Sequence, residues 1–161
     1  MANSIKYPYL PEGKTILYAR EDNKYMQEAK RIALTQSTDK KVPTGVVVVD
    51  DKGEILVSAA NQSALKNKFL LSTHPNWCIR KFFKIPSGQK YWLCPGCASY
   101  KNHGEYRSVL ALEKEFPQKI NSNLDLYLWG HWWCCKSCWD KMIQVGIKNI
   151  YLMEGIEKQF K

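Results

Sequence analysis

Two short motifs combine residue types that bind metal ions and move protons. One runs from His103 to Glu105, and the other runs from Cys135 to Cys138. One imidazole and two thiolates favour tetrahedral zinc, and three protein ligands leave a fourth position for water. Zinc lowers the pKa of such a water, and a carboxylate beside the metal can accept and return a proton. The motifs therefore predict a catalytic zinc site with His103, Cys135 and Cys138 as its ligands. Glu105 is the predicted proton carrier.

Two other interpretations of these motifs stay open. A zinc site that only stabilises the fold would use the same residue types, but it does not require Glu105 and usually takes a fourth protein ligand. A Cys-x-x-Cys pair can also be a redox pair. Each motif is expected to lie at the N-terminus of a helix, where the positive end of the helix dipole lowers the pKa of a thiol.

A second group of candidate metal ligands comes earlier in the chain. Cys94 and Cys97 flank a Pro-Gly turn that could direct two thiolates at one ion. With Cys78 and one histidine they would make a closed structural zinc site, which can order a loop that has little core of its own. His74 is the predicted fourth ligand and His131 is the alternative. Unligated buried thiols or a redox pair are the competing interpretations.

The elements that must position these residues follow from hydrophobic periodicity and turn signals. Residues 45–49 form a β-branched run typical of a strand buried on both faces, and a turn at 50–53 leads into an antiparallel partner. A strand, a helix and a strand near the C-terminus predict a parallel pair. We expect a mixed sheet with helices on both faces, from these elements: helices 20–37, 105–116 and 136–145, and strands 45–49, 54–58, 124–129 and 148–153.

Positive charge is concentrated in one irregular segment, residues 62–102, which we interpret as an insertion into a smaller core. The formal net charge is +9, and this segment contains seven Lys or Arg residues and no acidic residue. Aromatic residues interleave with the basic ones. The pattern favours an anionic partner such as a nucleotide or nucleic acid, and a solvated lysine-rich loop is the alternative.

Length and composition limit the classes of protein that remain. The chain has 161 residues, of which 45% are hydrophobic, so we expect a single domain over 1–161 with a sizeable core. No apolar run is long enough to span a membrane, and residues 1–10 do not look like a signal peptide. We expect a cytosolic protein whose six cysteines are reduced or metal-bound.

The motifs together resemble the signature of the zinc-dependent cytidine and deoxycytidylate deaminases, His-x-Glu followed by Pro-Cys-x-x-Cys. The resemblance extends over residues 20–61 and 103–155, and it implies a three-layer α/β/α sandwich with about five strands. Two positions depart from the family pattern. Gly104 replaces the usual Ala and keeps the backbone N–H that faces the base. Cys134 replaces the usual Pro, and we interpret it as a packing residue, with a spare thiol or a substitute ligand as alternatives.

The resemblance also implies substrate contacts. Asn61 matches the asparagine that holds the sugar or base, although it could instead cap a turn. Trp132 and Trp133 precede the zinc ligands, where the family places residues that wall the base pocket; ordinary core packing is the other interpretation. Backbone contacts at Gly104 complete the implied substrate site.

Among these enzymes the chain is most similar to deoxycytidylate deaminases, because a basic segment beside the pocket suits a nucleotide. The implied reaction converts dCMP to dUMP and ammonia, with zinc as cofactor and in some members a second zinc. A homo-oligomer, dimer or hexamer, and a deoxynucleoside triphosphate regulator are implied partners. The alternatives are a deaminase acting on RNA or single-stranded DNA, and a non-catalytic zinc-stabilised protein that binds nucleic acid.

Overall fold

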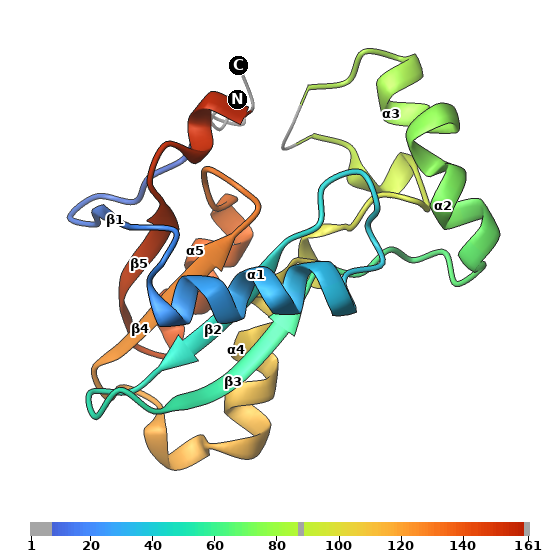
Figure 1. Ribbon diagram of the computed structural model, residues 1–161. Coiled ribbons are helices and arrows are strands. Elements are labelled where there is room, and N and C mark those ends of the chain that lie inside the picture. Colours follow the sequence, from blue (N-terminus) through green and yellow to red (C-terminus); the bar gives the residue numbers. More distant parts are fainter. Residues whose placement is uncertain (1–7, 87–88, 160–161) are drawn as a thin grey trace, which may run out of the picture.

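A mixed five-stranded sheet forms the centre of the protein in this computed structural model, which describes residues 8–86 and 89–159 (Figure 1). The strands occur in the order β1-β5-β4-β2-β3. β4 and β1 both run parallel to β5, whereas β2 runs antiparallel to β3 and β4. The predicted parallel pair and the predicted hairpin are therefore confirmed. The strand bounds are as follows: β1 Ile16–Ala19, β2 Gly45–Val49, β3 Ile55–Ala60, β4 Leu124–Trp129 and β5 Ile147–Met153.

Helices cover both faces of this sheet and complete the predicted three-layer α/β/α fold (Figure 1). α1 (Lys24–Gln36) lies on one face, and α4 (Gly104–Glu115) and α5 (Lys136–Gln144) pack together on the other. Neighbouring residues of β2 point to opposite faces, as in any strand. Gly45 lies against the backbone of α1, and the side chain of Val46 lies against Gly104 at the start of α4. All five residues of β2 are buried, as the sequence predicts.

Some element boundaries differ from the predictions for local reasons. α1 begins at Lys24 and not at residue 20, because the Asn23 side chain accepts hydrogen bonds from the backbone N–H groups of Tyr25 and Met26 and caps the helix there. The four-residue edge strand β1 was not predicted. Such a short strand carries almost no periodicity of its own, and it forms by pairing with β5.

The insertion at 62–102 is more regular than predicted. It contains helices α2 (Lys68–Trp77) and α3 (Ile79–Phe82). Pro75 lies inside α2 and removes one backbone hydrogen bond. Because of this proline, the sequence does not predict a helix here. α2 forms nevertheless because Asn67 caps its start and the Trp77 indole donates to the Leu70 carbonyl oxygen.

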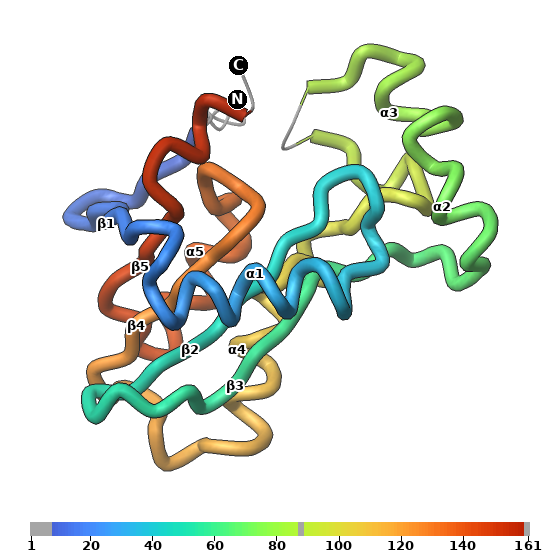
Figure 2. The backbone as a smooth tube through the Cα atoms, in the orientation of Figure 1, coloured from blue at the N-terminus to red at the C-terminus, as the bar shows by residue number. Residues whose placement is uncertain are grey.

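The insertion folds back on itself beside the loop at 37–44 (Figure 2). Leu65 donates to the carbonyl oxygen of Pro95 at 2.9 Å, and the Ser63 hydroxyl donates to that of Gly96 at 2.6 Å. The Ala98 N–H donates to the Asp39 carboxylate at 3.3 Å. The insertion is thereby tied to the loop that follows α1. The single-domain prediction over 1–161 also includes residues 1–7, 87–88 and 160–161, which lie outside the described residues.

None of the helices within the described ranges combines the length and apolarity needed to cross a membrane.

Gly45→Ala tests how closely β2 approaches α1. A Cβ atom at residue 45 would overlap the Ala29 carbonyl oxygen and would lie 2.5 Å from the Ala33 backbone nitrogen. Because both neighbours are backbone atoms, the substitution should lower the free energy of unfolding by about 3 kcal/mol in urea denaturation. Gly13→Ala is the control: its φ is +71° but no atom lies within 4 Å, so it should cost only about 1 kcal/mol. An equal loss in both variants would contradict the close packing.

Candidate active site

Three candidate metal ligands meet where α4 and α5 begin. His103 and Cys135 are the residues that precede the two helices, and Cys138 lies in the first turn of α5. The His103 Nδ1 atom lies 3.7 Å from the Cys135 Sγ atom and 3.6 Å from the Cys138 Sγ atom. Tetrahedral zinc bonds to nitrogen and sulfur would separate these atoms by about 3.6 Å. The donor set and its spacing therefore fit zinc, and we call these three residues the His103 site.

A backbone carbonyl fixes the orientation of the His103 ring. The Nε2 atom lies 3.2 Å from the Ala98 carbonyl oxygen, which can only accept a hydrogen bond. The proton of a neutral ring is therefore on Nε2, and the lone pair of Nδ1 points toward the two thiols. This arrangement is typical of metal-binding histidines, whose second nitrogen is held by a carbonyl or carboxylate.

The local electrostatics favour one thiolate at this site. The pKa of Cys135 is lowered to about 4, because the Cys138 thiol donates to it and His103 lies beside it, although burial opposes the shift. Burial alone would lower the pKa of His103, but the interaction with Cys135 and the charge of Glu105 raise it. Both helices present their N-termini here, and their dipoles stabilise negative charge.

Glu105 is the buried carboxylate of the site. Its side chain is only 5% exposed, and burial raises its pKa, against the opposing effect of His103. The Cys134 thiol donates a hydrogen bond to this carboxylate. Cys134 is itself fully buried in the core and is not one of the three clustered donors, so its predicted packing role agrees with its position. The hydrogen bond to Glu105 was not foreseen.

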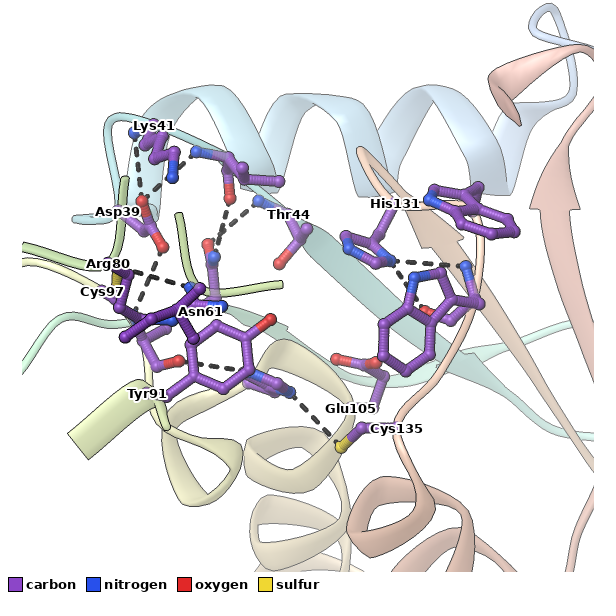
Figure 3. A pocket seen from close by; sticks show the side chains of 16 residues that line it. Asp39, Lys41, Thr44, Asn61, Arg80, Tyr91, Cys97, Glu105, His131 and Cys135 are labelled. Atoms are coloured by element: carbon purple, nitrogen blue, oxygen red, sulfur yellow. Dashed lines mark hydrogen bonds between the residues drawn. The ribbon is translucent and has the colours of Figure 1, made fainter. Parts of the chain in front are cut away.

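A cavity of about 280 Å³ opens beside these residues (Figure 3). Glu105, Cys135 and His131 lie on one side of it, and Tyr91, Arg80 and Asp39 lie on the other. Such a volume suits a small ligand, and the wall mixes aromatic rings with polar groups. The aromatic residues predicted to wall a base pocket do line it: Trp132, which is half-buried, and Trp133, which is 4% exposed.

Of the two predicted substrate contacts Asn61 and Gly104, only Asn61 is among the residues that line the cavity. Gly104 does not line the cavity; it packs under β2 and β3, where a Cβ atom would lie 3.1 Å from Val46 Cγ2. Asn61 does line the cavity, but its amide also holds the loop at 37–44. Its Oδ1 atom accepts from Ser37 at 2.5 Å and from the Thr44 N–H at 2.9 Å, and its Nδ2 atom donates to Val42.

Asn61→Ala should therefore destabilise the loop at 37–44. The variant leaves the Thr44 N–H and the Val42 carbonyl without their partner, so the free energy of unfolding should fall by about 2 kcal/mol. Equilibrium urea unfolding measures the loss. The control is Gln62→Ala, which removes a half-buried amide from the same segment, bonded to the Thr38 hydroxyl and the Gln36 carbonyl oxygen, and should cost less, about 1 kcal/mol. If Asn61→Ala keeps wild-type stability and only raises KM, its amide serves the substrate alone.

The structure brings the predicted second group together in the insertion. His74, Cys78, Cys94 and Cys97, called the insertion cluster below, are all buried, and their donor atoms lie within 4.8 Å of one another. His74 Nε2 lies 3.3 Å from Cys94 Sγ and 3.7 Å from Cys97 Sγ, and the thiols of Cys78 and Cys97 are 3.7 Å apart. The spacing suits a closed tetrahedral site.

The fourth member of this cluster is His74, whereas His131 is in the cavity wall. His131 Nδ1 lies 2.8 Å from the Trp133 carbonyl oxygen, and burial lowers its pKa to about 4. Gly96 explains why the Pro-Gly turn can approach His74, because a Cβ atom at residue 96 would overlap the imidazole ring.

Together the fold and the site define a class: an α/β protein with a three-donor metal site at two helix N-termini, beside a buried carboxylate and a cavity. The family model of the cytidine and deoxycytidylate deaminase zinc-binding region matches residues 19–154. The chain therefore belongs to this family of zinc-dependent deaminases, whose members hydrolyse C–N bonds.

Comparison with individual proteins adds little to this assignment. No curated protein matches the chain significantly. A solved structure of guanine deaminase from Bacillus subtilis is similar, with 16% identity, a TM-score of 0.45 and coverage of 84% of this chain and 67% of that one. A likeness of this degree does not bear on the substrate.

Proposed function

We propose that the protein catalyses the hydrolytic deamination of dCMP to dUMP and ammonia. The observation that carries the proposal is the convergence of His103, Cys135 and Cys138 beside the buried carboxylate of Glu105 in one cavity. A zinc ion held by these three ligands would supply an activated water for attack at C4 of cytosine. Glu105 would accept the proton of that water and deliver it to the departing amino group.

Aromatic residues of the cavity wall would hold the base. Trp132 and Trp133 line the cavity together with Glu105 and Cys135, and Tyr91 lines it from the insertion. A flat pyrimidine ring stacks well on such side chains. Their arrangement favours a nucleobase over an aliphatic amidine.

Two cations, Lys41 and Arg80, line the cavity. The Arg80 guanidinium donates to two backbone carbonyl oxygens and to Cys97 Sγ, so Lys41 is the cation that favours a phosphorylated substrate. Asp39 also lines it, but its carboxylate accepts three backbone N–H groups, from Lys41, Val42 and Ala98. The other basic residues of the insertion do not line the cavity, so the phosphate proposal rests on far fewer charges than the sequence suggests: Lys66, Lys68, Lys81, Lys84, Lys90 and Lys101.

A second, structural zinc in the insertion cluster is part of the proposal. Three thiols and one imidazole fill all four positions of a tetrahedral ion and leave none for water. The ion would order a segment whose own apolar core contains little more than Trp77, Ile79 and Tyr91 packed on the cysteines.

A deaminase of single-stranded nucleic acid is the second candidate. The observation that favours it is a set of exposed aromatic side chains on the insertion, 66–80% exposed, among the basic residues named above: Phe69, Phe82, Phe83 and Trp92. Exposed rings among lysines are typical of surfaces on which unpaired bases stack.

Measuring kcat/KM for dCMP, deoxycytidine and a short deoxycytidine-containing single strand separates these candidates. If dCMP is the substrate, removing its phosphate should lower kcat/KM by at least about 10-fold. Lys41→Gln should remove most of that preference with the metal content unchanged, which metal analysis checks because the Lys41 Nζ atom also lies 3.7 Å from the Cys78 Sγ atom. Lys40→Gln is the control, because Lys40 is the neighbouring cation and does not line the cavity. Turnover of the single strand alone, with a steep salt dependence, would replace the dCMP proposal with the second candidate.

A further inference from the structure

Arg80 carries a buried positive charge that has no carboxylate partner. Its side chain is 5% exposed, and none of the carboxylates in the described part of the chain forms an ion pair with it. Its Nη1 atom lies 3.8 Å from the Cys97 Sγ atom. Because a buried charge is costly unless it is paired, the natural counter-charge is the insertion cluster itself. Three thiolates and a neutral imidazole around a divalent ion carry one net negative charge.

Arg80 also holds the chain that leads to the active site. Its Nη2 atom donates to the Pro86 carbonyl oxygen at 2.7 Å, and its Nε atom donates to that of Gln89 at 2.9 Å. The guanidinium carbon lies 3.9 Å from the centre of the Tyr91 ring. Tyr91 in turn packs edge-on against the His103 ring, with 5.5 Å between the ring centres and 89° between the planes. Figure 3 shows Arg80, Cys97 and Tyr91 together on one side of the cavity.

A second connection runs through the backbone. Ala98 follows the cluster residue Cys97 directly, and its carbonyl oxygen is the group that accepts from His103 Nε2. The Ala98 N–H is held by Asp39. The position of this carbonyl therefore depends on where the cluster holds Cys97. Two routes lead from the cluster to one imidazole, one by hydrogen bond and one by ring packing.

We propose that the metal-loaded insertion cluster, acting through Ala98 and through Arg80 and Tyr91, positions His103 for the metal of the active site. Arg80 and Tyr91 are then positioning residues. The inference rests on the proposed function only in that His103, Cys135 and Cys138 hold a metal ion, and it is independent of which base is deaminated.

Metal competition on the full-length, cobalt-loaded protein tests this coupling. A three-thiolate cobalt site absorbs more strongly in the thiolate-to-metal region than a two-thiolate site, so the two ions can be followed separately while a chelator is added. Arg80→Gln keeps all seven ligands. It should weaken cobalt binding at the His103 site by about 10-fold to 100-fold, as expected when a group that orients a ligand is lost.

Lys81→Gln is the matched control, because it removes the same charge from the neighbouring, exposed position of α3 and should leave both affinities unchanged. Cys78→Ser, which removes a cluster ligand outside the cavity, should weaken both sites. The proposal is overturned if Arg80→Gln leaves the affinity of the His103 site within about twofold of wild type.

The wild-type protein provides a test that needs no variant. If the cluster positions His103, removing the ion of the insertion cluster with chelator should weaken metal binding at the His103 site. An emptied insertion cluster beside a His103 site of unchanged affinity would overturn the proposal. A protein that shows the coupling but does not deaminate dCMP would refute the proposed substrate and leave the coupling intact.

Discussion

Glu105→Gln should lower kcat for dCMP by about 10²–10⁴-fold and leave the zinc content unchanged. The amide has nearly the shape of the carboxylate, so it fills the same buried space, but it cannot accept the proton of an attacking water. Glu105 is not one of the clustered donors, and no metal ligand is therefore lost. The measurement is steady-state ammonia release together with metal analysis of the purified variant.

Glu115→Gln is the control for this prediction, because Glu115 lies at the exposed C-terminal end of the same helix and should be silent. Two results would contradict the role of Glu105. One is turnover within a few fold of wild type. The other is loss of zinc in parallel with activity, which would make Glu105 a group that supports the metal instead of a proton carrier.

Cys135→Ser should remove the catalytic metal and with it the activity. Supporting groups around metal ligands contribute about 10–100-fold in affinity, so loss of a ligand should cost more than about 100-fold. The variant should bind one zinc ion fewer per chain than wild type when it is measured after dialysis against a weak chelator, and turnover should fall in proportion to the lost metal.

Cys134→Ser is a close control, since it makes the same change one residue earlier at a fully buried thiol. The serine hydroxyl can still donate to Glu105, so zinc should stay bound and activity should remain within about 10-fold of wild type. Loss of zinc in Cys134→Ser, with zinc retained in Cys135→Ser, would show that the wrong cysteine has been taken as the ligand.

The sequence predicts much of this fold because its signals are local. The valine run of β2 indicates a strand buried on both faces, and residues 50–53 indicate the turn of a hairpin. His103 and Cys135 could be placed before helices because each is followed by a clear amphipathic pattern. The family model and the mixed sheet confirm the deaminase fold.

Features that depend on tertiary contacts could not be predicted. β1 exists through pairing with β5, and α2 persists despite Pro75. The choice between His74 and His131 depended on which histidine the insertion brings to the thiols, and spacing along the chain cannot reveal that. His74 is separated from Cys94 by 20 residues, and only the folded insertion places them 3.3 Å apart.

The buried partners of the site were equally hidden. Nothing in the local sequence marks Ala98 as the residue whose carbonyl holds His103, or Cys134 as a donor to Glu105. Arg80 looks like one of several basic residues of a solvated segment, yet it is buried against a cysteine and a tyrosine. The sequence shows only an arginine in a segment without acidic residues. Its burial, which sets it apart from the other basic residues, is known only from the fold.

The most direct test of the central claim is ammonia release by the zinc-loaded protein from a panel of bases, nucleosides and nucleotides: dCMP, CMP, dCTP, deoxycytidine, cytidine, guanine and a short single-stranded oligonucleotide. We expect one equivalent of ammonia for each dUMP formed from dCMP, and none from the Glu105→Ala variant. Zinc-loaded protein that releases no ammonia from dCMP would contradict the proposed function, and silence across the whole panel would also contradict deaminase activity at this site.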